Sequence, residues 1–82
     1  MKQINIRGPI VSDAEKWIYD FFEMACTTPG SFLAELQEAD GEDVLVLINS
    51  VGGYVTQAAE IYEAIRSYSG KVTGKVIGQA CS

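Results

Sequence analysis

The sequence predicts an α/β fold in which the elements follow in the order β-α-α-β-α-β around a parallel sheet. Apolar and polar residues alternate over residues 3–8, and five consecutive apolar residues follow Asp43. Between and after these segments, apolar residues recur at helical spacing. Because strands that are separated by helices are joined by right-handed crossovers, we expect parallel strands with helices on the faces of the sheet.

The first strand and first helix are predicted over residues 3–8 and 12–26. Ile4 and Ile6 fall on one side of the strand, which ends at Gly8. Ser12 and Glu15 fit a capping box at the start of the helix. The apolar face of this helix is expected to hold Ala14, Trp17, Ile18, Phe21, Phe22 and Ala25.

A shorter helix is predicted after the breaker at residues 27–31. Either Thr28 caps it, with Pro29 at the first helical position, or Ser31 does. Phe32, Leu33 and Leu36 are its apolar residues, and we expect it to stop before Gly41.

The remaining elements are a strand at residues 43–49, a helix and a final strand at residues 71–78. The middle strand is predicted to be buried on both faces, because its central residues are all apolar. Residues 50–53 form a turn, and residues 69–70 close the helix. The apolar face expected for that helix holds Val55, Ala58, Ala59, Tyr62 and Ile65.

Composition excludes several classes of function. Hydrophobic residues make up 48% of the 82-residue chain and charged residues 21%, as in ordinary soluble proteins. The net charge of −5 makes nucleic acid and anionic membranes poor partners. No apolar run approaches a spanning helix and the start is not a signal peptide, so we expect a cytoplasmic protein.

The chain contains no histidine, so these residues alone cannot form a Ser-His-Asp triad. Cys26 and Cys81 lie too far apart in the sequence for a zinc signature, and no metal or other cofactor is expected. Both cysteines are interpreted as small buried apolar residues. Carboxylates on the outer helix faces are expected to be solvated, and the aromatic residues to serve the core or a subunit contact.

Two segments follow the carboxyl ends of predicted strands, where parallel sheets bind ligands. In residues 49–53 (Asn-Ser-Val-Gly-Gly), the glycines permit a positive φ and the close approach of another backbone. The helix start beyond them offers N–H groups to a carbonyl oxygen or an anion. A plain strand-to-helix turn remains the alternative.

The second segment is residues 78–82 (Gly-Gln-Ala-Cys-Ser), in which Ser82 places a hydroxyl just past a strand. A serine at such a turn can act as a nucleophile, although a serine with no function is the alternative. Cys81 could replace it as the nucleophile, but no neighbouring His or Lys would lower its pKa.

Taken together, residues 47–53, 59–62 and 76–82 resemble the Clp protease proteolytic subunit family. That family shows I-N-S-P-G-G, then a helix with an I-Y pair, then G-Q-A-A-S, in the order and spacing found here. Residues 6–10 and 16–24 look more like the phage and prophage Clp-like proteases that mature capsids. By this resemblance, residues 1–82 form a single incomplete α/β domain, the N-terminal part of a crotonase-like fold.

The resemblance implies a serine endopeptidase that hydrolyses peptide bonds through an acyl-enzyme. Ser82 matches the nucleophile, Gly53 the glycine of the oxyanion hole, and Val51 and Gly52 the segment that pairs with substrate. The family's His and Asp follow the serine. Val51 stands where the family has Pro or Gly, and Cys81 where it has Ala.

The resemblance also implies a peptide or protein substrate, a homo-oligomer, and a capsid or scaffold protein or an ATPase unfoldase as a possible partner. We expect the 82-residue chain to be truncated at the nucleophile and inactive alone. One alternative is a non-catalytic assembly module or degenerate subunit. Another is a crotonase-type acyl-CoA enzyme, against which residues 78–82 argue.

Overall fold

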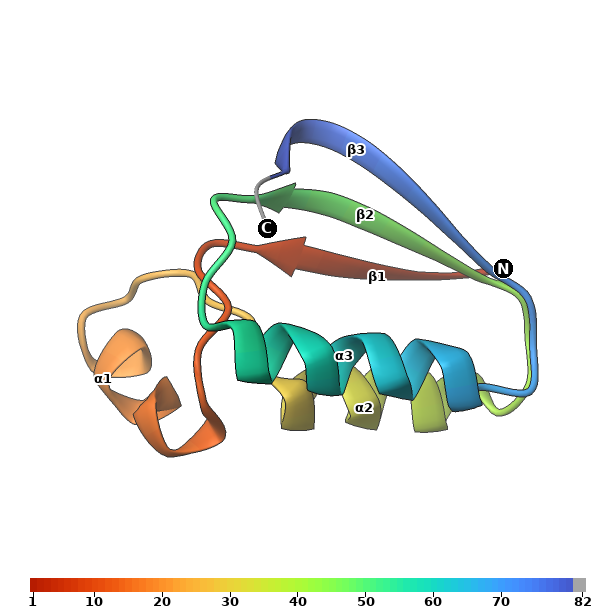
Figure 1. Cartoon of the computed structure of the whole chain (residues 1–82), viewed down its shortest axis with the longest axis horizontal. Helices are drawn as coiled ribbons and strands as arrows, with labels where there is room; N and C mark the ends of the chain where they lie inside the picture. The colour runs from red at the N-terminus through yellow and green to blue at the C-terminus, as the bar shows by residue number, and fades with distance from the viewer. Residues whose placement is uncertain (81–82) are drawn as a thin grey trace.

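The computed structural model of the chain describes residues 1–80 and has the predicted α/β architecture (Figure 1). Each predicted element is present, although several bounds differ, and the first helical segment divides into a 3₁₀ turn and a short α-helix. The elements are β1 (Lys2–Arg7), η1 (Asp13–Glu15), α1 (Lys16–Phe21), α2 (Pro29–Ala39), β2 (Val44–Ser50), α3 (Val55–Ser67) and β3 (Val72–Ala80).

The three strands form a parallel sheet in the order β1-β2-β3. Val46 at the centre of β2 lies opposite Ile4 on one side and Gly74 on the other. Near the end of β2 the register shifts, so that Ser50 lies opposite Ala80. The carboxyl ends of β2 and β3 therefore meet at one edge of the sheet.

Both long helices cover the same face of the sheet, which corrects the expectation of helices on its two faces (Figure 1). Successive right-handed crossovers that move in one direction along a sheet place their helices on one side. Val44 and Val46 face these helices and are buried, whereas Leu45 and Leu47 are only half-buried. The prediction that β2 is buried on both faces is therefore wrong for this part of the chain.

The core fills the space between the sheet and these helices. Phe32 and Leu36 of α2 are 1% and 2% exposed, and Ile61 of α3 is 4% exposed. Side chains of α3 such as Ala64 and Ile65 pack against this cluster. The buried members of the cluster are Ile4, Ile6, Phe32, Leu36, Ala39, Val44, Val46 and Ile61.

The α1 region is shorter than the helix predicted over residues 12–26. The α-helix ends at Phe21, and Glu23 takes a left-handed conformation with φ 55°. The following residues then run to Thr27, whose N–H donates to the Pro9 carbonyl at 3.0 Å. The backbone of Thr27 therefore pairs with the segment after β1, and this pairing takes the place of further helical hydrogen bonds.

The expected capping box at Ser12 is also absent, because the Ser12 side chain accepts no backbone hydrogen bond. Its hydroxyl instead donates to Glu15 Oε1 at 2.8 Å. At α2, by contrast, Thr28 is the cap: its Oγ1 accepts from the Ser31 N–H at 3.2 Å, and Pro29 occupies the first helical position. The structure thus decides between the two alternatives for that cap.

The apolar face of α3 is rotated from the predicted one. Ile61, which the prediction left out, is the buried residue of this helix, whereas Val55 and Tyr62 are exposed. Trp17, Phe21 and Phe22 are exposed as well, so these aromatics do not belong to the core of the described chain. Within residues 1–80, no helix is long and apolar enough to cross a membrane.

Candidate active site

The loop from β2 to α3 lies at the carboxyl edge of the sheet, next to the end of β3 (Figure 1). Ser50, the last residue of β2, lies opposite Ala80 of β3. The loop after β2 and the end of β3, the two segments that the sequence indicated, therefore lie close together. This holds up to Ala80, the last described residue. Ser82 and Cys81, the two candidate nucleophiles, lie outside the described residues.

The two glycines of the loop are required for different reasons. Gly52 has φ +93°, a conformation that side chains rarely adopt. Gly53 has no such dihedral, but a Cβ added to it would lie 2.1 Å from the carbonyl oxygen of Ile10. Both predicted features, a positive φ and a close backbone approach, are therefore present, and the approaching backbone belongs to the chain itself.

Ile10 holds the loop through two backbone hydrogen bonds. Its N–H donates to the Gly52 carbonyl at 2.9 Å, and its carbonyl accepts from the Tyr54 N–H at 3.1 Å. On its other side, residue 10 forms a parallel bridge with Thr27. The loop is thus paired with the segment after β1, and the Gly52 carbonyl is already occupied by that pairing.

The hydroxyl group of Ser50 stabilises the loop through two hydrogen bonds. Its side chain is 4% exposed, its hydroxyl donates to the Gly8 carbonyl at 2.6 Å, and its Oγ accepts from the Gly52 N–H at 3.0 Å. In the sequence, Ser50 is predicted only as part of a turn. A small hydroxyl residue directly before a Val-Gly-Gly segment was the available signal.

The backbone N–H of Gly53 is a hydrogen-bond donor that the loop itself does not use. No atom in residues 1–80 accepts a hydrogen bond from it, and Gly53 is exposed. It lies just before α3, whose N-cap residue, Tyr54, provides no side-chain cap. The positive end of the helix dipole favours negative charge at this point. A carbonyl oxygen of another molecule could therefore accept from this amide.

A side-chain bridge that the sequence did not indicate ties Tyr54 to the η1 turn. The Tyr54 hydroxyl donates to Glu15 Oε2 at 3.2 Å, while Glu15 Oε1 accepts from Ser12. The hydrogen bond to Glu15, and then its negative charge, raise the pKa of the Tyr54 phenol. The bridge fixes the residue that follows Gly53.

Other reactive groups lie away from this loop. Cys26 is half-buried, and burial raises the pKa of its thiol more than nearby Lys16 lowers it. A raised pKa leaves little thiolate, so Cys26 is a poor nucleophile. Among residues 1–80, no group of three His, Cys, Asp or Glu side chains is arranged to hold a metal ion.

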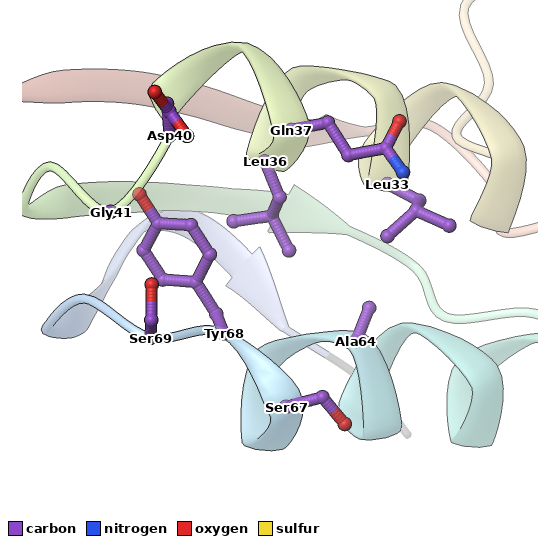
Figure 2. Close-up of a pocket in the computed structure, with 9 residues that line it drawn as sticks. All are labelled: Leu33, Leu36, Gln37, Asp40, Gly41, Ala64, Ser67, Tyr68 and Ser69. Atoms are coloured by element: carbon purple, nitrogen blue, oxygen red, sulfur yellow. The ribbon is translucent and has the colours of Figure 1, made fainter.

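A cavity of about 340 Å³ lies between the carboxyl ends of α2 and α3 (Figure 2). Its lining includes Leu33, Leu36 and Tyr68. Tyr68 donates to the Glu42 carbonyl at 2.6 Å just before β2 begins, so this cavity is at the opposite end of the strands from Gly53. Neither glycine of the loop lines it, and it contributes nothing to the candidate site.

Comparisons of the sequence with known proteins identify its family. The sequence model of the Clp protease family matches residues 15–82. The chain is 39% identical over 59 residues to the ATP-dependent Clp protease proteolytic subunit 1 of Chlamydia felis (strain Fe/C-56). It is also 39% identical over 59 residues to the ATP-dependent Clp protease proteolytic subunit 2 of Chlamydia abortus (strain DSM 27085 / S26/3).

Each of these matches covers 72% of the chain and 29% of the relative. The chain therefore spans less than a third of the length of these relatives. The family model, however, covers the candidate loop and the end of β3, which are the two places that the motifs indicated. On this evidence, the chain belongs to the Clp protease family.

Proposed function

We propose that this chain contributes the nucleophile and one oxyanion-hole donor of a serine endopeptidase. Ser82 is the proposed nucleophile, and the Gly53 N–H is the proposed donor. The observation that carries the proposal is the N–H of Gly53, which is exposed and unused in the loop after β2, in a member of the Clp protease family. The last residue of β2, Ser50, lies opposite Ala80 of β3. Val51 and Gly52 are proposed to line the path of the substrate backbone.

The reaction would be peptide hydrolysis through an acyl-enzyme. The Ser82 Oγ attacks the scissile carbonyl carbon, and the electron pair of the C=O bond moves onto its oxygen. The Gly53 N–H then donates to this oxyanion, and one such donor is worth about 3 kcal/mol. Collapse of the intermediate expels the amine, and water later releases the acyl group from Ser82.

A base must accept the proton of Ser82 for this reaction to proceed. The 82 residues contain no histidine, so the proposal requires a base from outside them. We therefore expect a polypeptide limited to these residues to hydrolyse no peptide. No metal or cofactor takes part in the proposed reaction.

The resemblance of residues 6–10 and 16–24 supports a phage or prophage type of Clp-like protease. Its substrates would then be capsid or scaffold proteins in the cytoplasm of a bacterial host. A homo-oligomer, with or without an ATPase unfoldase, is proposed on the same resemblance. These assignments depend on the peptidase proposal and fail with it.

The test begins with the coding DNA that follows the codon of Ser82. Where the reading frame continues, the whole encoded protein is treated with a fluorophosphonate probe and with fluorogenic peptides. We expect stoichiometric labelling that Ser82→Ala abolishes and that Ser69→Ala, a change at another exposed serine, leaves intact. Labelling that survives Ser82→Ala would overturn the assignment.

Two further results would favour other functions. A stop codon after Ser82, together with no labelling, would favour a non-catalytic assembly module. Binding of a CoA thioester in calorimetry, without labelling of Ser82, would favour a crotonase-type enzyme. Stoichiometric labelling of Ser82 in the 82-residue polypeptide would contradict the requirement for an added base.

A further inference from the structure

The pairing of β2 with β3 is irregular at the edge of the sheet where the candidate site lies. Ile48 lies opposite Val76, and Ser50, two residues further along β2, lies opposite Ala80. Four residues of β3 therefore match two residues of β2, so β3 contains a bulge between these pairs. β3 also bends near this end (Figure 1). Bulges change the direction of a strand and re-aim the residues that follow, and they are frequent next to active sites.

The side chain of Asn49 lies against this bulge. Asn49 is the residue of β2 between the two pairs, and Gly78 is midway between them on β3. A Cβ added to Gly78 would lie 2.5 Å from Asn49 Oδ1, 2.8 Å from its Cγ and 3.1 Å from its Nδ2. Gly78 has no left-handed φ, so the amide of Asn49, and not the backbone conformation, excludes a side chain at this position.

This contact joins the two segments that carry the candidate site. Asn49 opens residues 49–53, which contain the proposed oxyanion donor, the N–H of Gly53. Gly78 opens residues 78–82, which end with the proposed nucleophile. The amide of Asn49 is therefore placed where it can couple the position of one segment to that of the other.

The bulge decides which residue of β3 reaches the end of β2. If the pairing of Ile48 with Val76 continued regularly, Ser50 would lie opposite Gly78 instead of Ala80. Ala80 would then lie roughly 7 Å further along the strand, at about 3.3 Å per residue. A reacting group that is misplaced by only about 1 Å can cost a hundredfold in rate. The register of the bulge must therefore be fixed for the residues that follow to be usable.

We propose that Asn49 is a positioning residue, which holds the bulge of β3 in its observed register. A bulge removes backbone groups from the ladder between two strands, and an amide side chain offers both a donor and an acceptor to replace the lost partners. Asn49 acts through Gly78 and Ala80 on the direction in which the chain continues to Ser82. This inference rests on the proposed function, in which Ser82 is the nucleophile.

The register is measurable by NMR in the 82-residue chain, without any activity. Nuclear Overhauser effects between backbone protons of Ser50 and Ala80 report the bulged pairing, and those between Ser50 and Gly78 report the regular one. We expect Asn49→Ala to weaken the first set while preserving the far-UV circular dichroism. Asn5→Ala is the matched control, since Asn5 is also an exposed asparagine, on β1, and should change neither set. An unchanged pattern in Asn49→Ala would overturn the proposal.

In the whole encoded protein, the same substitution should slow the reaction more than it weakens the binding of substrate. We expect Asn49→Ala to lower the rate of fluorophosphonate labelling of Ser82, and kcat for fluorogenic peptides, by about tenfold or more. KM should change by less than about twofold. Asn5→Ala should keep the rates of the unmodified protein. A raised KM with an unchanged kcat would contradict a positioning role.

Gly78→Ala tests the contact from the other strand, because its Cβ would displace the amide of Asn49. We expect Gly78→Ala to slow labelling about as much as Asn49→Ala does, and the double variant to be no slower than either one. Gly74→Ala is the control within β3, since a Cβ there meets only Ile48 Cδ1, at 3.7 Å. Losses that add up in the double variant would contradict the contact.

Failure of this inference differs from failure of the proposed function. Equal labelling of Ser82 in the unmodified protein and in Asn49→Ala would overturn the positioning role and leave the peptidase proposal standing. An unmodified protein in which Ser82 is never labelled would overturn the peptidase proposal, and the role of Asn49 in placing a nucleophile with it, whichever register the NMR comparison shows.

Discussion

At the residue scale, the close contact between Gly53 and Ile10 gives the candidate site its shape. The Ile10 carbonyl oxygen and nitrogen lie 2.1 and 2.7 Å from the place where a Cβ of residue 53 would be. Both atoms belong to the backbone, and Ile10 is held on its other side by Thr27. The contact therefore cannot be relieved by a change of side-chain rotamer.

Gly53→Ala should consequently separate the loop from Ile10 and break the two hydrogen bonds between them. We expect it to lower the free energy of unfolding by about 2 kcal/mol in urea titrations. Gly74→Ala is the control, because a Cβ there meets only Ile48 Cδ1, at 3.7 Å. That change should be neutral or should stabilise the chain by up to about 1 kcal/mol. Equal effects of the two substitutions would contradict the role given to Ile10.

The bridge between Tyr54 and Glu15 predicts a dependence of stability on pH. The folded state raises the pKa of the Tyr54 phenol above its ordinary value of 10.0, so it holds this proton more tightly than the unfolded chain does. The resulting stabilisation is fully present below pH 10.0. It is lost as the pH rises from 10.0 through the higher pKa of the folded state.

Urea midpoints measured at neutral pH and above pH 10 should therefore differ more for the unmodified chain than for Tyr54→Phe, whose side chain does not titrate. Glu63→Gln, which removes an exposed ion pair with Arg66, is a control that should leave the pH dependence unchanged. An identical loss of stability in the chain and in Tyr54→Phe would contradict the bridge.

The loop glycines are predictable from the sequence, but the groups that hold them are not. A Gly-Gly pair after an apolar strand indicates a tight turn whatever lies around it. The roles of Ser50, Glu15 and Ile10 depend on contacts with residues far away in the chain, such as Gly8 and Tyr54. No local pattern encodes those contacts, so they could not be predicted.

At the element scale, the two early helices show when local signals are sufficient. The start of α2 combines Thr28, Pro29 and Ser31, and all three act where helix-start chemistry predicts. At η1 the same kind of signal, Ser12 with Glu15, gives a side-chain pair and no backbone cap. The difference is that Thr28 is fully buried and its helix packs on the core.

Thr28→Ala should therefore destabilise the chain by about 1–2 kcal/mol, because it leaves the Ser31 N–H without its acceptor. Ser12→Ala removes a hydroxyl that caps no backbone group and should cost less than about 0.5 kcal/mol. Thermal unfolding followed by circular dichroism compares the two. A larger loss for Ser12→Ala would show that η1, and not α2, depends on its cap.

The predicted helix over residues 12–26 was too long for a tertiary reason. Its apolar spacing is real, but the spacing marks exposed side chains, such as Trp17 and Phe21, instead of a core-facing stripe. Thr27 must reach Arg7 and Pro9 to pair with the end of β1, and its hydroxyl donates to the Arg7 carbonyl at 2.9 Å. A helix that continued to residue 26 could not make that connection.

At the scale of the whole molecule, stability rests on one layer of helices over one face of the sheet. A domain of 82 residues has about 4–12 kcal/mol of stability at ordinary values per residue. Phe32, which is 1% exposed, packs between α2 and the sheet. Loss of its ring should leave a cavity that this small core cannot close.

We expect Phe32→Ala to lower stability by about 3–5 kcal/mol and to leave much of the chain unfolded at moderate urea concentrations. The neighbouring Leu33 is 44% exposed, and Leu33→Ala should cost about 1 kcal/mol or less. Urea unfolding followed by circular dichroism measures both. A small effect of Phe32→Ala would mean that the helices do not depend on this core.

Four features were predictable from the amino-acid sequence: the alternation of strands and helices, the parallel sheet, the loop glycines, and the cap of α2 as one of two alternatives. These features follow from local periodicity and backbone sterics, which act over a few neighbouring residues. Three features became known only from the folded chain: both long helices lie on one face of the sheet, Ile61 and not Tyr62 enters the core, and Ile10 holds the loop. Those outcomes depend on which distant surfaces meet, because burial and backbone pairing are satisfied by the whole chain together.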